Sequence, residues 1–114
     1  MYALKNKVQL IGNLGNAPEI KTTETGKKYA RMSMATNEHY KNAQGEKVTE
    51  TQWHNLVAWG KVADLAEQYL AKGSELAIEG KLTHRDYTDN AGVKKYITEV
   101  QVNEILLLDK KENK

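Results

Sequence analysis

Three aromatic residues stand where an ordinary core would not require a large ring. Trp53, Trp59 and Tyr87 are each flanked by polar, basic or turn-forming residues. Flat rings held among such neighbours suit stacking on nucleobases, because every base has a π-face. Core packing is the alternative for either tryptophan, since a ring in a strand of a small domain more often contributes to the core.

Strand geometry determines how the two tryptophans can act together. Side chains of equal parity in a strand point to one face, so Trp53 and Trp59 share a face and lie roughly 20 Å apart. This separation excludes stacking of one ring on the other and suits two contacts along an extended strand. Arg31 and Lys61 are placed to flank that track.

Rings and cations coincide at two further places. Arg85 and Tyr87 share one face of a later strand, and Tyr40 with Lys41 opens a long hairpin loop that ends at Lys47. Basic and aromatic residues on shared faces are typical of surfaces that bind single-stranded nucleic acid.

The charge balance means that cations alone would hold nucleic acid weakly. The chain has 17 basic and 15 acidic residues, and its last six residues, DKKENK, hold three of the basic and two of the acidic ones. The remaining 108 residues therefore carry 14 basic and 13 acidic residues, a net charge of +1. Binding of nucleic acid would require clustered cations together with the rings.

Composition also limits the class of protein. The 114 residues fit one domain, and the absence of cysteine excludes disulfides, thiolate metal sites and cysteine nucleophiles. The N-terminal MYALKNKVQL lacks the apolar run of a signal peptide, and no stretch approaches the roughly 20 apolar residues of a membrane span. A reducing cytoplasm is the predicted location.

Hydrophobic periodicity predicts the elements. Alternation indicates five strands, at residues 4–14, 29–37, 48–59, 75–88 and 94–108, and a helical period runs from Val62 to Leu70, with Gly73 as its C-terminal cap. Turn-forming residues at 41–47 and 88–93 predict hairpins. This order predicts an all-β domain with one helix, an OB-fold: a five-stranded antiparallel Greek-key barrel with the helix between strands three and four. The domain spans residues 1–108, followed by a short charged tail at 109–114.

The same periodicity predicts which side chains face the interior. Leu76, Ile78 and Leu82 point inward on the fourth strand, and Tyr69 lies on the apolar stripe of the helix. Tyr29, Tyr69 and Tyr96 are predicted to be structural rather than functional, Tyr69 because of its place on that stripe.

Four strings together indicate a family. These are NKVQLIGNLGNAPE at 6–19, TQWHNLVAWGKVADLAEQYLAKGS at 51–74, IEGKL at 78–82 and YITEVQVNEI at 96–105. In order and from about residue 5 to residue 107, the chain resembles the bacterial single-stranded DNA-binding protein (SSB) family. The resemblance implies an OB domain that assembles as a homotetramer and binds single-stranded DNA, with little sequence preference, in replication, recombination and repair. It also implies a cytoplasmic, nucleoid-associated location and no cofactor or metal.

The resemblance also implies site residues. The stacking aromatics of the family fall on Tyr40, Trp53, Trp59 and Tyr87, of which two are Tyr where the best-known members have Trp, and Trp59 replaces Phe. Asn55 and Asp86 replace residues that are basic in some members, which weakens the expected electrostatic attraction. The candidate phosphate contacts are Lys21, Arg31, Lys41, Lys61, Lys72, Arg85 and Lys94, with Lys7 as a weaker one.

His54 matches a position that the family uses for subunit contact, and the alternative is a hydrogen bond within its own barrel.

The C-terminus departs from the family, whose members usually continue into a Gly- and Pro-rich linker with an acidic tip that recruits replication and repair enzymes. The sequence stops at DKKENK, so it does not support recruitment by that route. A trimmed domain and a naturally short form both fit.

Other functions are less well supported by the sequence. His39, His54 and His84 are scattered, and no metal-ligand spacing, Gly-rich phosphate loop or nucleophile elbow occurs, so an enzyme is not expected. A dimeric primosomal adaptor with an OB-fold that binds single strands is one alternative. A structural or oligosaccharide-binding OB module is another.

Overall fold

A computed structural model describes residues 5–108, and the predicted tail at 109–114 lies outside this part of the chain. The domain boundary at residue 108 stays a prediction. Within residues 5–108, one α-helix lies between the fourth and fifth of six strands. The elements are β1 (Val8–Leu14), β2 (Glu19–Thr22), β3 (Lys28–Lys41), β4 (Lys47–Trp59), α1 (Lys61–Tyr69), β5 (Glu75–Thr88) and β6 (Lys94–Leu107).

The strands close into a barrel. Their order is β1-β5-β6-β4-β3-β2, and β1 also pairs with β3 where Asn13 and Leu14 lie opposite Ala35 and Met34. All pairs are antiparallel except β4 with β6, which are parallel around Leu56 and Val100. Five strands complete the barrel and β2 extends its rim along β3, which confirms the predicted OB-fold.

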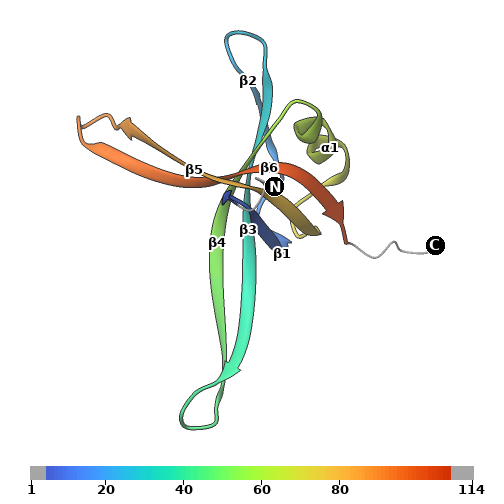
Figure 1. Cartoon of the computed structure of the whole chain (residues 1–114), viewed down its shortest axis with the longest axis vertical. Helices are drawn as coiled ribbons and strands as arrows, with labels where there is room; N and C mark the ends of the chain where they lie inside the picture. Colours follow the sequence, from blue (N-terminus) through green and yellow to red (C-terminus); the bar gives the residue numbers. More distant parts are fainter. Residues whose placement is uncertain (1–4, 109–114) are drawn as a thin grey trace, which may run out of the picture.

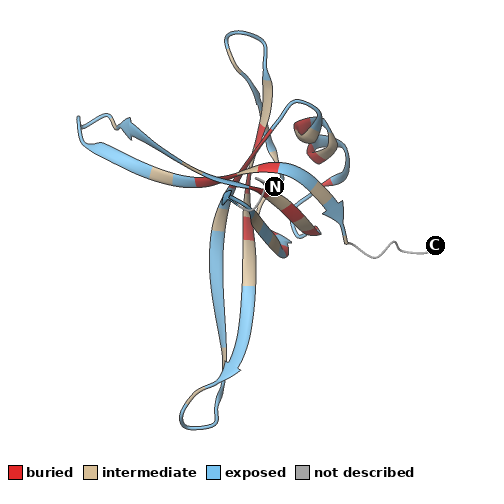
Figure 2. Cartoon of the chain, in the orientation of Figure 1, coloured by how far each residue is buried: buried red, intermediate tan, exposed pale blue. Residues whose placement is uncertain are grey.

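The core lies where the strands cross (Figure 2). Inward residues of β3 and β4, including Met32, Met34 and Leu56, are buried together with Leu76 of β5. Helix α1 adds Ala63 and Ala66 to this cluster. Gly12 allows β1 to approach β3, because a Cβ there would lie 2.1 Å from the carbonyl oxygen of Ala35.

Two hairpins extend beyond the barrel as arms, β3–β4 downward and β5–β6 to the left in Figure 1. Each turn contains a glycine at positive φ, Gly45 at 80° and Gly92 at 83°. Asn42 and Asp89 accept hydrogen bonds from turn amides at the same two sites. The hairpins predicted at 41–47 and 88–93 are therefore confirmed.

Some inward predictions were wrong because the arms leave the core. Leu82, which was predicted to point inward, is 41% exposed, and Tyr96, which was predicted to be structural, is 74% exposed, although both keep the parity of inward residues. Tyr69, at the last turn of α1, is 61% exposed, so the apolar stripe of the helix is wider than the surface that it covers. By contrast, Tyr29 is half-buried.

The boundaries also differ from the prediction. Strand β2 is an extra element of four residues, and β3 runs to Lys41 because its pairing with β4 continues to the turn. The helix ends at Tyr69, since Leu70 turns to an extended conformation and is buried. Gly73 is thus no helix cap; it lies in the next turn at φ 90°, where its amide donates to the carbonyl of Leu14.

Candidate nucleic-acid interface

The outer face of β4 carries both tryptophans. Trp53 is 62% exposed and Trp59 is 39% exposed, whereas Leu56 and Ala58 on the opposite face are fully buried. The alternation predicted for this strand is confirmed, and the core-packing alternative for both tryptophans is wrong.

Trp53 rests against the backbone that follows β1. A Cβ at Gly15 would lie 2.5 Å from the Trp53 ring, so only glycine leaves room for the ring in this position. The Gly15 amide donates to the carbonyl of Ser33 (2.8 Å), and the Ser33 amide donates to Oδ1 of Asn16 (2.9 Å). These bonds fix the surface on which the indole lies while its other side stays open.

Trp59 is supported by a neighbouring ring. Tyr29 is its partner across β3 and β4, with ring centroids 4.9 Å apart and planes tilted by 34°. The guanidinium carbon of Arg31 lies 5.7 Å from the Tyr29 centroid, a cation–π distance. Lys21 of β2 pairs with Tyr29 on the other side and is exposed, so a lysine, two rings and an arginine lie together.

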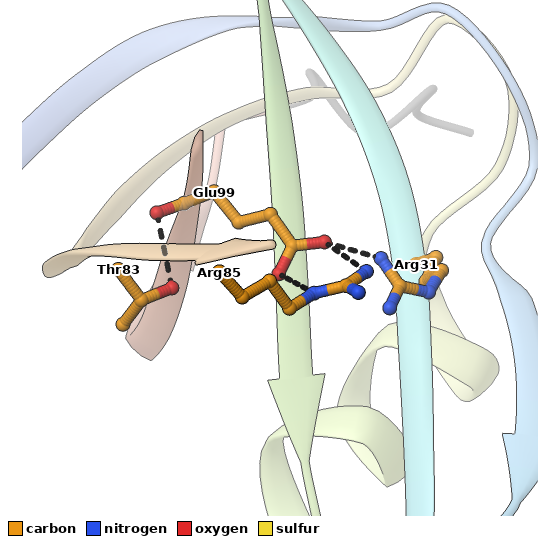
Figure 3. A network of polar contacts seen from close by, with 4 residues as sticks. All are labelled: Arg31, Thr83, Arg85 and Glu99. Carbon is orange, nitrogen blue, oxygen red and sulfur yellow. Dashed lines mark hydrogen bonds and ion pairs between the residues drawn. The ribbon is translucent and has the colours of Figure 1, made fainter. Parts of the chain in front are cut away.

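Two arginines converge on one buried carboxylate (Figure 3). Glu99 of β6 has a side chain only 5% exposed, and its Oε2 accepts a hydrogen bond from Nη1 of Arg31. Nε and Nη2 of Arg85 donate to Oε1 and Oε2 of the same carboxylate, each at 3.3 Å. The Thr83 hydroxyl donates to the Glu99 carbonyl at 3.4 Å. Three strands are thereby linked through one acidic residue.

These contacts set the ionisation of Glu99. Burial alone would raise the pKa of its carboxyl, but hydrogen bonds from Arg85 and Arg31 and their positive charges outweigh it and lower the pKa below the ordinary 4.5. Glu99 is therefore ionised at neutral pH.

The arms bring the tyrosines to different faces. Tyr87 is 45% exposed and has the parity of Arg85 on β5, so the two share the outer face as predicted. Tyr40 is 49% exposed but pairs with Val48, which gives it the parity opposite to that of Trp53. Within the β3–β4 arm, Tyr40 lines a hollow with Lys41 and Lys47.

Several predicted cations lie off the outer face. Lys94 pairs with Asp86 (3.3 Å) and lies 5.8 Å from the Tyr96 centroid, on the reverse side of the β5–β6 arm. Lys72 lies in the turn after α1. Lys61 begins α1 and lines a separate cavity beside Ile11 and Leu106. Lys7 forms an ion pair with Glu79 at 3.4 Å.

His54 makes a hydrogen bond within its own barrel, between Nε2 and the Thr36 hydroxyl at 2.9 Å. This is the alternative that the sequence left open, and it does not test a role in subunit contact.

Within residues 5–108, no cluster of three or more His, Asp or Glu side chains could hold a metal ion. No helix in this part of the chain is long and apolar enough to cross a membrane.

Comparison with known proteins identifies the family. The model of the single-strand binding protein family matches residues 5–108. The chain belongs to this family.

Individual relatives agree with that assignment. Single-stranded DNA-binding protein 1 of Chlorobaculum tepidum is 44% identical over 109 residues, covering 95% of this chain and 67% of its own. The single-stranded DNA-binding protein of Xanthomonas campestris pv. campestris is 43% identical over 103 residues, covering 90% of this chain and 60% of its own. This family member thus spans about two thirds or less of the length of those relatives.

A solved structure has the same fold. The structure described as "Plasmodium falciparum SSB complex with ssDNA" superposes with a TM-score of 0.83 at 34% identity, covering 91% of this chain and 95% of that one. The resemblance inferred from the four sequence strings is therefore confirmed.

Two residues of the interface in this SSB-family chain, Glu99 and Gly15, are not predicted from the sequence. Glu99 is a charged residue in an alternating strand, which ordinarily indicates a solvent-facing position. Gly15 and Asn16 follow β1 directly, and this pair of turn-forming residues is the signal that the sequence offers. Only the structure shows that Gly15 lies under the Trp53 ring.

Replacing Gly15 should move the Trp53 ring without unfolding the domain. The atoms that a new Cβ would meet belong to the free edge of the indole, which can rotate away. In a Trp59→Phe background, Gly15→Ala should shift Trp53 emission and make it easier to quench with acrylamide. The urea midpoint should change little. If acrylamide quenches Trp53 equally in both proteins and the urea midpoint is that of the parent, the close contact between Gly15 and the Trp53 ring is contradicted.

Glu99 should make stability depend on pH. Because its folded pKa is lowered, its contribution is complete above the ordinary value of 4.5 and is lost as pH falls through the folded pKa. Urea unfolding of the wild type and Glu99→Gln should therefore show a constant difference in free energy of unfolding at neutral pH. That difference should shrink as the pH falls below the ordinary value of 4.5 and through the lowered folded pKa of Glu99. A difference that stays constant to the acid end would contradict an ionised Glu99.

Proposed function

We propose that this domain binds single-stranded DNA with little sequence preference, and so serves DNA replication, recombination and repair without catalysing a reaction. One observation carries the proposal: Trp53 and Trp59 are exposed on one strand face, and the two arginines lie on that same face. Family membership and the names of the relatives support it.

The proposed mechanism is capture by stacking. Bases leave water to stack on Trp53, Trp59 and Tyr87, and on Tyr40 after the strand crosses the arm, with each contact worth roughly 1 to 3 kcal/mol. Phosphates approach the cations Lys21, Arg31 and Arg85 on the outer face. Lys41 has the parity of Arg31 but lies at the far end of the β3–β4 arm, whereas Lys61, Lys72 and Lys94 lie off this face. These four lysines are proposed as contacts for a longer strand. A duplex hides the faces of its bases and should bind far more weakly.

We further propose that the domain self-associates, as a homotetramer, in the cytoplasm with the nucleoid. Ile11 and Leu106 are 62% and 64% exposed and lie in one row across β1, β5 and β6, with Ala77 between them. They line an apolar cavity of about 700 Å³. In addition, residues 8–12 of β1 pair only with β5 within the described chain, which leaves a strand edge that a second copy could extend. His54 is proposed to support the same contact.

Trp53 should contribute strongly to affinity for single strands. Its indole fluorescence should be quenched by oligo(dT) at low salt and much less by a matched duplex or a neutral polysaccharide. Trp53→Ala should weaken oligo(dT) binding about 5-fold to 150-fold, the equivalent of one stacked base. The matched control is Tyr69→Ala, which removes an equally exposed ring from the helix.

Both variants should keep the urea midpoint of the wild type. Wild-type emission that oligo(dT) leaves unchanged at low salt would overturn the proposed function. Equal losses for Trp53→Ala and Tyr69→Ala would remove Trp53 from the interface.

The apolar row should control assembly. Light scattering of the wild type should give four times the 12.9 kDa mass of the chain. Ile11→Lys combined with Leu106→Lys should lower that mass, because two charges would be buried in the contact. Glu24→Lys, in the exposed β2–β3 turn, is the control for added charge. A monomeric wild type, or a tetramer that the double change leaves intact, would contradict this surface.

A further inference from the structure

We propose that Glu99 is a positioning residue that joins Arg31 and Arg85 into one seat for a single phosphodiester group, between the two tryptophans. The inference rests on the proposed function and goes further, because it assigns a role to an acidic residue inside a site for a polyanion. It also gives the number of phosphates that the two arginines bind together.

The choice of residue supports the seat. Of the 17 basic residues in the chain only two are arginine, and both contact Glu99. Arginine presents five N–H donors in a planar fork that matches a phosphate, whereas lysine acts as a point charge. The carboxylate engages one N–H of Arg31 and two of Arg85, so each guanidinium keeps donors for a second acceptor.

The burial pattern gives the seat a direction. The Glu99 side chain is 5% exposed, while those of Arg31 and Arg85 are 35% and 46% exposed. The acid therefore lies beneath the face and holds two guanidinium groups that reach solvent. Held from below, the arginines lose little further side-chain freedom when an anion binds above them.

The charge count sets the stoichiometry. Glu99 is ionised, so the two arginines and the carboxylate together carry one positive charge. A phosphodiester carries one negative charge, and one such group would neutralise the cluster. Two independent arginines would instead neutralise two phosphates.

The location fits a strand that stacks on both tryptophans. Arg31 pairs with Val57, which lies four residues after Trp53 and two before Trp59 on β4. These steps correspond to about 13 Å and about 7 Å of strand. Arg85 continues the same face toward Tyr87, its neighbour two residues along β5.

The test measures oligo(dT) affinity as a function of salt. Each neutralised phosphate contributes a slope of about 0.7 in log affinity against log salt for single strands. Arg31→Gln combined with Arg85→Gln should reduce the slope by about 0.7, and two independent contacts would reduce it by about 1.4. The single changes should be strongly non-additive, each losing most of what the double change loses. A reduction near the larger value with additive single changes would overturn the seat.

Two further variants separate positioning from charge. Arg31→Lys combined with Arg85→Lys keeps every charge but loses the fork, and it should weaken binding about 10-fold or more. Glu99→Gln removes the negative charge between the two arginines and so makes the net charge of the face more positive. Affinity should therefore rise if the arginines act only as charges, whereas the seat predicts that affinity falls. Unchanged binding by the lysine variant, or tighter binding by Glu99→Gln, would contradict the proposal.

Separate controls distinguish a variant that fails to fold, a failure of the proposed function and a failure of the seat. If Glu99→Gln fails to fold, Glu99→Asp replaces it, because aspartate keeps the charge but draws the carboxylate back by one methylene. The seat predicts weaker binding for that variant as well, and wild-type affinity would overturn it. Failure of the wild type to bind oligo(dT) would refute the proposed function; binding by the wild type with unaffected arginine variants would refute the seat alone.

Discussion

Strand β4 is the constraint on which the rest of the structure depends. It pairs with β3 on one side and with β6 on the other, and its alternation sends Leu56 and Ala58 into the core and Trp53 and Trp59 to the surface. A shift of one residue in its register would exchange these two sets. The apolar residues that hold the barrel together therefore also fix the side on which the rings are exposed.

The outer face combines two kinds of support for exposed functional groups. Each tryptophan lies against a fixed neighbour, Trp53 on the backbone of Gly15 and Trp59 on the ring of Tyr29. Arg31 and Arg85 are held by an acid beneath them. A domain with a net charge near zero can in this way present a local positive site between rings, because its charges are clustered.

Sequence periodicity predicted the barrel strands, the helix and the parity of β4, since each depends on local alternation. It gave the wrong exposure for Leu82 and Tyr96, because alternation continues along an arm that has already left the core. Strand β2 was missed because its four residues have little apolar content and pair at the rim. Glu99 could not be found in this way, since its carboxylate is bound by arginines of two other strands, and alternation within β6 carries no information on these contacts.

A two-dimensional NMR titration with oligo(dT) shows whether one outer face of the sheet binds the strand, through the indole N–H groups of both tryptophans and the Nε–H groups of both arginines. If it does, the signals of Trp53, Trp59, Arg31 and Arg85 should shift together and saturate at the same ratio of oligonucleotide to protein. Shifts confined to the reverse side of the β5–β6 arm, around Tyr96 and Lys94, with these four signals unmoved, would contradict it.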